Sequence, residues 1–145
     1  MTLLLALPAY SKLRFGVAAL SPENRESRHA AGRARFVGLV DGTRLAVFPG
    51  KRFTVDTVAG TREANSNDTC ERESYELTVT MSSADKPADL TAAAVAYWQR
   101  AGLPAVEPQT SFANVDGDDI VIALSLNEHQ GRASIFGAGP CLPMA

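Results

Sequence analysis

The most regular hydrophobic pattern in the chain spans residues 87–102 and predicts an amphipathic helix. Apolar or small residues recur there at spacings of three and four, at Leu90, Ala94, Tyr97, Trp98 and Ala101. This spacing places them on one stripe of a helix, which then packs against another element. We expect Asp85 to cap the helix N-terminus and Pro87 to lie in the first turn. Gly102 and Pro104 should end the helix, because glycine favours a left-handed stop and proline cannot continue it.

Alternating apolar and polar residues on both sides of this helix predict strands. Within residues 74–81, and again within 120–126, every second residue is a large apolar one. That alternation is typical of a strand with one buried and one solvated face. Further short strands are expected at residues 53–58, 105–107, 111–115 and 132–136. Together these elements predict an α+β fold in which an antiparallel sheet carries one main helix, about residues 87–102, on one face.

The region upstream of these strands predicts a linker and a hairpin. Residues 21–35 contain almost no large apolar side chain, which is typical of a polar linker or loosely helical spacer. Residues 36–48 predict a β-hairpin whose turn is Asp41-Gly42. With 145 residues, of which 46% are hydrophobic and 21% charged, the chain has the length and composition of one globular domain. We therefore expect a single α+β domain at residues 36–145.

The N-terminal segment, residues 1–20, begins with an apolar run from Leu3 to Ala9 that is followed by basic residues. A secretory signal has basic residues before its apolar core, and a membrane-spanning helix needs about 20 apolar residues, so the run is incomplete by either standard. We interpret it as the end of a truncated membrane anchor or a signal remnant, with a tether through the residues before Tyr10. The alternative is a short amphipathic or strand segment that packs on the domain.

The net charge of -2 argues against general nucleic-acid binding, which depends on a dense excess of lysine and arginine. The positive charges are nevertheless clustered in the predicted linker, at Arg25, Arg28, His29, Arg33 and Arg35. We interpret this cluster as a solvated linker, and contact with lipid headgroups or nucleic acid is the alternative.

The two cysteines, Cys70 and Cys141, are each expected just outside a strand, so a bridge between them would join the start of one strand to the end of another. We predict that they form a disulfide, which in the chain-entropy model would stabilise the fold by about 4 kcal/mol. A disulfide implies an oxidising compartment. The alternative is a pair of unpaired thiols in a cytosolic protein.

No catalytic, cofactor-binding or metal-binding residue is assigned, because the reactive residue types form no recognisable motif. His29 lies in the predicted linker and His129 in a predicted hairpin, and no nucleophile motif accompanies either. Residues 114–119 alternate side-chain oxygens but lack the other ligands of a calcium loop, so they predict a polar hairpin tip. Dispersed carboxylates brought together by the fold would make the chain a hydrolase instead. The candidates for that alternative are Glu76, Glu107, Asp116, Asp118 and Asp119.

Tyr97 and Trp98 form an aromatic pair on the predicted helix and are the candidate binding surface. Adjacent residues on a helix point about 100° apart, so only one of the two rings faces the core directly. We expect core packing to be the main role of the pair, and a ligand groove is the alternative.

Several segments of the C-terminal half are similar in layout to a group of exported bacterial proteins. They are Cys70, the Glu-Leu-Thr-Val-Thr strand, the Ala-Tyr-Trp-Gln-Arg helix, the Asp-Asp-Ile-Val-Ile-Ala-Leu strand and the terminal Gly-Pro-Cys. Over residues 67–143 this layout resembles small exported proteins of high-GC Gram-positive bacteria that are membrane-tethered or lipoproteins. The resemblance implies export and a fold, and it assigns no catalytic residue.

Three functional hypotheses follow from these observations. The first is a non-catalytic, extracytoplasmic domain, tethered to a membrane or secreted, that binds a protein or a cell-envelope component and no nucleic acid. The second is a hydrolase whose site is assembled from dispersed carboxylates. The third is a cytosolic accessory protein with free thiols. A flat exposed surface favours the first hypothesis, and a deep pocket with converging carboxylates favours the second.

Overall fold

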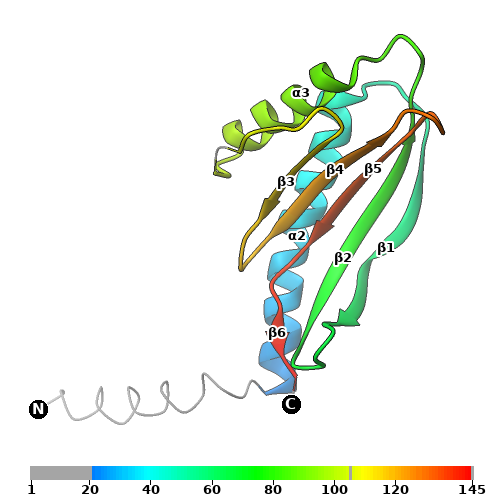
Figure 1. Cartoon of the computed structure of the whole chain (residues 1–145). Helices are drawn as coiled ribbons and strands as arrows, with labels where there is room; N and C mark the ends of the chain where they lie inside the picture. The colour runs from blue at the N-terminus through cyan, green and yellow to red at the C-terminus, as the bar shows by residue number, and fades with distance from the viewer. Residues whose placement is uncertain (1–20, 105, 145) are drawn as a thin grey trace, which may run out of the picture.

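The computed structural model describes residues 21–104 and 106–144 (Figure 1). The elements in this part of the chain are α2 (Pro22–Val47), β1 (Phe53–Ala64), β2 (Cys70–Thr80), α3 (Pro87–Arg100), β3 (Phe112–Asp116), β4 (Val121–Asn127), β5 (Arg132–Ala138) and β6 (Leu142–Pro143). The six strands form one antiparallel sheet, so the predicted α+β fold is confirmed. The anchor that we expect within residues 1–20 lies outside the described residues.

The sheet has the strand order β1-β2-β5-β4-β3, and β6 pairs with the start of β2. Helix α2 runs along one face of the sheet and packs on β2 and β5 (Figure 1). Helix α3 packs against α2 and lies beside β3 and β4. The helix predicted at residues 87–102 is therefore present as α3, but the helix that covers the centre of the sheet is α2.

Helix α2 occupies both segments, so the hairpin predicted at 36–48 was wrong, and residues 21–35, expected as a polar linker or loosely helical spacer, form a regular helix. Ser21 caps this helix, because its Oγ accepts a hydrogen bond from the backbone N–H of Asn24 at 3.2 Å. Pro22 follows in the first turn, where its missing N–H costs nothing. The first half of the helix is polar but rich in glutamate, arginine and alanine, which are strong helix formers. One continuous helix thus crosses the boundary that we expected between linker and domain.

The dipeptide Asp41-Gly42, expected at a hairpin turn, lies inside α2, where α3 packs closely against it. A Cβ atom at Gly42 would overlap the hydroxyl group of Tyr97 on α3. Glycine in a helix interior costs about 1 kcal/mol relative to alanine. The close approach of the two helices at this point explains why a glycine is nevertheless accommodated.

The hydrophobic core lies between the two helices and the face of the sheet that they cover. Its fully buried side chains include Trp98, Phe36, Phe48, Leu77, Ile122, Leu124 and Ile135. The indole Nε1 of Trp98 donates to Thr43 Oγ1 at 2.8 Å, and Thr43 Oγ1 donates to the carbonyl oxygen of Leu39 at 2.6 Å. A buried indole N–H needs such a partner, so these bonds join α3 to α2 and leave neither the indole N–H nor the Thr43 hydroxyl unpaired.

The predicted end of α3 is confirmed, and its predicted cap is wrong. Gly102 adopts a positive φ of 91°, and the N–H of Leu103 donates to the carbonyl oxygen of Trp98 at 2.9 Å. This is the pattern of a Schellman stop. At the other end, Lys86 occupies the N-cap position and makes no side-chain cap bond. Asp85 is instead engaged by the loop before the helix, so it does not cap α3.

Four of the predicted strands are present as β1, β3, β4 and β5, and residues 74–81 lie largely within β2. Strand β1 continues to Ala64, well past the predicted end at residue 58. The strand predicted at 105–107 was wrong, since Val106 and Glu107 lie in no strand and residue 105 is outside the described part. The short strand β6 was not predicted, because two residues carry no periodicity.

Candidate functional site

The candidate site is the face of the sheet opposite the helices, which no described element covers. On β2 the covered face carries Leu77 and Val79, which are fully buried. The alternate residues Thr78 and Thr80 point to the other face, where Thr80 is exposed and Thr78 half-buried. Figure 1 shows α2 along only one side of the strands. We call the opposite side the open face.

Strand register arranges the open face into rows that cross several strands. The first row contains four hydroxyl groups in adjacent strands, from Thr54, Thr78, Ser134 and Ser125. We call these four residues the hydroxyl row. Neighbouring strands are about 4.8 Å apart, so the row spans about 14 Å of the sheet. Directly opposite residues of antiparallel strands share a face, so the four hydroxyl groups lie on one surface.

A second row lies next to the hydroxyl row and carries two arginines. Thr80 pairs with Arg132 on β5, and the N–H of Thr80 donates to the carbonyl oxygen of Arg52 at 2.9 Å. Arg52 and Arg132 therefore flank Thr80 on its two sides. Arg132 pairs further with Asn127 on β4. We call Arg52, Thr80 and Arg132 the arginine row.

Two shallow hollows lie over these rows. One has a volume of about 660 Å³ and is lined by Lys51, Arg52, Phe53, Thr54, Thr78, Thr80 and Arg132. The other has a volume of about 250 Å³ and shares Thr78 and Arg132 with the first. Hydroxyl and guanidinium groups therefore dominate a concave part of the open face.

Carboxylates on the open face are engaged by the hydroxyl row. Ser134 Oγ donates to Glu76 Oε2 at 2.7 Å. Thr78 and Thr54 both donate to Asp56, Thr54 at 3.3 Å. A hydroxyl that donates its proton in this way keeps lone pairs that can accept a hydrogen bond from a ligand.

The cations at this end of the sheet differ in whether a carboxylate neutralises them. Lys51 Nζ lies 3.4 Å from Asp85 Oδ2. The pKa of Asp85 is lowered, first by the backbone N–H of Ser82, which donates to the carboxylate, and further by Lys51. In the described part of the chain, neither Arg52 nor Arg132 has a carboxylate oxygen within 4.0 Å.

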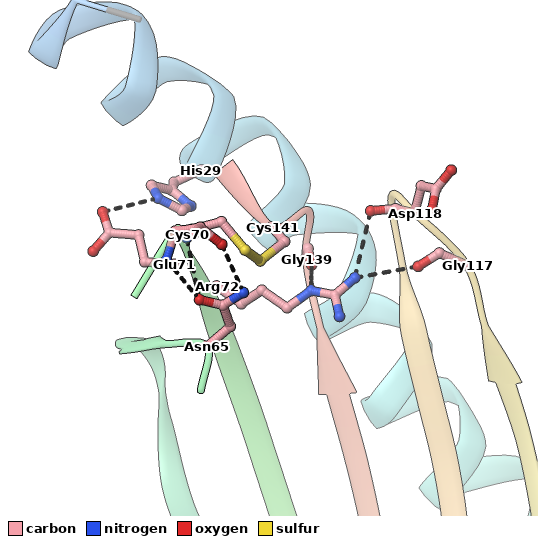
Figure 2. Close-up of a disulfide and its surroundings, with 10 residues drawn as sticks. His29, Asn65, Cys70, Glu71, Arg72, Gly117, Asp118, Gly139 and Cys141 are labelled. Atoms are coloured by element: carbon pink, nitrogen blue, oxygen red, sulfur yellow. Dashed lines mark hydrogen bonds and ion pairs between the residues drawn. A yellow bond between two sulfur atoms is a disulfide. The ribbon is translucent and has the colours of Figure 1, made fainter. Parts of the chain in front are cut away.

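The opposite end of the sheet is closed by the predicted disulfide (Figure 2). Cys70 and Cys141 are bonded, with their Cα atoms 5.4 Å apart, which confirms the predicted pair. Arg72 beside it donates from Nε to the carbonyl oxygen of Gly139 at 2.8 Å and from Nη2 to that of Gly117 at 3.2 Å. The bridge and this arginine thus hold the segment after β5 and the β3–β4 turn against the start of β2.

Most of the basic cluster that we interpreted as a solvated linker is paired with the sheet. Arg33 donates to both oxygens of Glu73 at 2.7 Å, and Arg62 Nε donates to the same carboxylate at 2.8 Å. The carboxylate of Glu73 is only 1% exposed. Burial raises its pKa, but the hydrogen bonds from the two arginines outweigh this and leave the pKa lowered. The interpretation as a solvated linker was therefore wrong.

Histidine 29 is also part of this interface and is not a solvated residue. Its side chain is 1% exposed, and its Nε2 lies 3.4 Å from Glu71 Oε1 (Figure 2). Arg25 Nη1 lies 3.7 Å from the same oxygen. These contacts fasten the first turns of α2 to the start of β2, next to the disulfide.

The aromatic pair of α3 does not form an exposed surface. Trp98 is 0% exposed and belongs to the core, which confirms its expected packing role. Tyr97 is half-buried against Gly42 of α2. The candidate binding surface therefore cannot include Trp98, and the role of Tyr97 in binding stays a prediction.

The acidic residues considered for a hydrolase are spread over different parts of the described chain. Glu76 and Asp116 share the open face but are separated by three strand spacings, about 14 Å of backbone. Glycoside hydrolases hold their two carboxyl groups about 5–10 Å apart. Glu107 lies in the connection between α3 and β3, and Asp118 lies in the turn between β3 and β4; both are exposed. Across residues 21–104 and 106–144, no three histidine, cysteine or acidic side chains gather closely enough to hold a metal ion.

The hydroxyl and arginine rows were not singled out from the sequence. The alternation along β2 predicted a solvated face, but serine and threonine on that face are ordinary solvent-exposed residues. Only the pairing register brings Arg52 and Arg132, which are 80 positions apart in the chain (132 minus 52), to the two sides of one threonine.

The disulfide is compatible with an extracellular location. None of the described helices combines the length and the apolar character that a membrane crossing requires. Neither a protein-family model, nor a curated protein, nor a solved structure matches the chain.

Proposed function

We propose that this protein is a non-catalytic, extracytoplasmic binding domain that recognises a cell-envelope component or an envelope protein through the open face. The residues before Tyr10 are its membrane tether in this proposal. The observation that supports it most directly is the open face itself, a broad surface, polar over the hydroxyl and arginine rows, that no described element covers.

The composition of the open face supports binding. This face carries four short hydroxyl side chains in a row across four strands, with charged side chains on both sides of the row. Short side chains lose little conformational entropy when a ligand orders them. The shallow hollows over the rows offer a surface on which an extended ligand can lie.

The disulfide supports the proposed compartment. Cytosolic reductants keep most thiols reduced, so a structural bridge is characteristic of exported proteins. The bridge lies at the end of the sheet away from the arginine row. It therefore rigidifies the domain without occupying the surface proposed to bind.

Co-sedimentation of the disulfide-bonded protein with isolated envelope material from the source organism tests the proposal. The chain offers two exposed serines for matched variants, Ser125 on the open face and Ser27 on α2. Ser125→Glu should weaken binding at least about tenfold, because a buried unpaired carboxylate at an interface is costly. Ser27→Glu should bind as the unmodified protein does. Equal binding by both variants, or equal loss in both, would contradict the proposal.

A further inference from the structure

We propose that the arginine row and the hydroxyl row together bind a phosphorylated polyol or sugar unit of a hydrophilic envelope polymer. This inference rests on the proposed function and names the ligand chemistry of the same face. The arginine row takes the phosphate group, and the hydroxyl row takes the neighbouring hydroxyl groups of the ligand.

The arginine row has the geometry for a single oxyanion. Adjacent strands are about 4.8 Å apart, so the backbones of Arg52 and Arg132 are about 10 Å apart with Thr80 between them. Long side chains that start on either side of a threonine can converge over it. Guanidinium groups bind phosphate oxygens through two parallel N–H donors, and the threonine hydroxyl adds a third donor group.

The charges of the arginine row remain free for a ligand. Both arginines are exposed, and among the described residues neither lies within 4.0 Å of a carboxylate oxygen. The guanidinium Nη2 of Arg132 donates to the neutral side chain of Gln130, at 2.5 Å. The paired Arg33 and Arg62 on the covered face show the contrast, because Glu73 and Glu26 together neutralise them. An exposed, unneutralised pair of arginines attracts an anion most strongly.

The hydroxyl row next to it presents acceptors. Thr78 and Ser134 donate their protons to Asp56 and Glu76, so their remaining lone pairs face the ligand side as acceptors. The carboxylates themselves add further acceptor oxygens. A ligand that meets this row must therefore donate hydrogen bonds, as the hydroxyl groups of a polyol or sugar do.

The order of charges across the face selects the ligand. An oxyanion fits over the arginine row, but Asp56 and Glu76, which lie just beyond the hydroxyl row, would repel a second anion there. A uniformly anionic surface, such as a phospholipid bilayer, would place further negative charges against Asp56 and Glu76 and be repelled there. A polymer unit with one phosphate and adjacent hydroxyl groups would not, and this favours the polymer as the source.

Calorimetric titration of the full disulfide-bonded chain with three soluble probes tests the inference. The probes are myo-inositol 1-phosphate, myo-inositol and inorganic phosphate. Binding of myo-inositol 1-phosphate at least about tenfold tighter than either other probe is expected. Equal affinity for inorganic phosphate and for myo-inositol 1-phosphate would overturn the role of the hydroxyl row, and no binding of any probe would overturn the whole inference.

Variants assign the two halves of the site. Arg52→Ala and Arg132→Ala should each weaken myo-inositol 1-phosphate about tenfold or more, whereas Arg28→Ala, which removes an exposed arginine of α2, should leave it unchanged. Thr78→Val, which keeps the side-chain shape, should weaken myo-inositol 1-phosphate and leave inorganic phosphate unaffected. An equal loss of affinity in Arg28→Ala would mean that the arginines attract the ligand only through non-specific charge, and this would refute the site.

Two further measurements separate this inference from the proposed function. Co-sedimentation with phosphatidylglycerol vesicles, but no binding of the soluble probes, would identify a lipid surface and overturn the polymer as the source. Envelope binding that survives both Arg52→Ala and Arg132→Ala, and is not displaced by myo-inositol 1-phosphate, would refute the inference and leave the proposed function standing. Loss of envelope binding in the Ser27→Glu control would instead count against the proposed function.

Discussion

The two faces of the sheet use their side chains in opposite ways. On the covered face Leu77 and Ile135 are fully buried, and the buried carboxylate of Glu73 is bonded to two arginines. On the open face Thr80 and Arg132 are exposed. The buried apolar side chains that stabilise the fold therefore lie on the covered face, and we expect the exposed polar groups of the open face to contribute little to stability. This difference is what makes the open face available to a ligand.

The largest effect should come from the centre of the covered side. Trp98→Ala removes a fully buried ring and leaves Thr43 without the indole donor, so we expect a loss of about 3–5 kcal/mol in the free energy of unfolding. Chemical denaturation followed by circular dichroism measures it. A loss below about 1 kcal/mol would mean that α3 is not an integral part of the core.

Removal of the disulfide should cost nearly as much, although the bridge lies at the periphery. Cys70 and Cys141 close a loop with a sequence separation of 71, and in the chain-entropy model this corresponds to about 4 kcal/mol. The double variant Cys70→Ser/Cys141→Ser, compared with the oxidised protein in denaturant, gives the value. An unchanged midpoint would show that packing alone holds β6 on β2.

The buried carboxylate of the covered face should make stability sensitive to acid. The pKa of Glu73 is lowered in the folded state from an ordinary value of 4.5, because the hydrogen bonds from Arg33 and Arg62 outweigh the effect of burial. A group with a lowered folded pKa stabilises the fold above its unfolded pKa, and this contribution is lost as pH falls through the folded pKa. Unfolding free energies measured from pH 7 to below 4.5 should therefore decrease as the pH falls.

The variant Glu73→Gln identifies the source of that decrease. It keeps the shape of the side chain and removes the charge, so stability at pH 7 should fall by about 1–3 kcal/mol. Its dependence on pH below 4.5 should be shallower than that of the unmodified protein. Parallel curves for the two proteins would assign the acid sensitivity to other carboxylates.

The smallest effects should come from the open face. Thr78→Val and Arg132→Ala change half-buried or exposed polar groups, so unfolding free energies should change by no more than about 0.5 kcal/mol. The same denaturation measurement checks both. A loss of more than about 2 kcal/mol in the unfolding free energy of either variant would contradict the comparison, because the open face would then also stabilise the fold.

Local sequence patterns predicted the elements that are stabilised by nearby residues or that need only some apolar surface to pack against. The apolar stripe and the glycine stop located α3, and the alternation located the solvated and buried faces of β2 and β4. The polar first half of α2 was missed because its partners, Glu71 and Glu73, lie about 40 residues away. A helix that is held by ion pairs instead of an apolar stripe has no periodic signal of its own.

The candidate site was predictable only in part, and for a similar reason. Alternation along β2 predicted that Thr78 and Thr80 face solvent, but serine and threonine at such positions have no distinctive spacing. Which residues lie beside them depends on the pairing of β1, β2 and β5, which was not predicted. Arg52 and Arg132 belong to segments far apart in sequence, so their relation to Thr80 follows from register alone.

The sequence by itself determined the fold class, helix α3 with its stop, most of the strands and the identity of the disulfide pair. These properties depend on short-range periodicity, on glycine conformation and on there being two cysteines. Only the tertiary structure decided that α2 is one helix, that Trp98 is the fully buried ring of the aromatic pair and that two arginines flank Thr80 beside a row of hydroxyl groups. Those properties depend on which distant segments meet, and a local pattern contains no information about its partner.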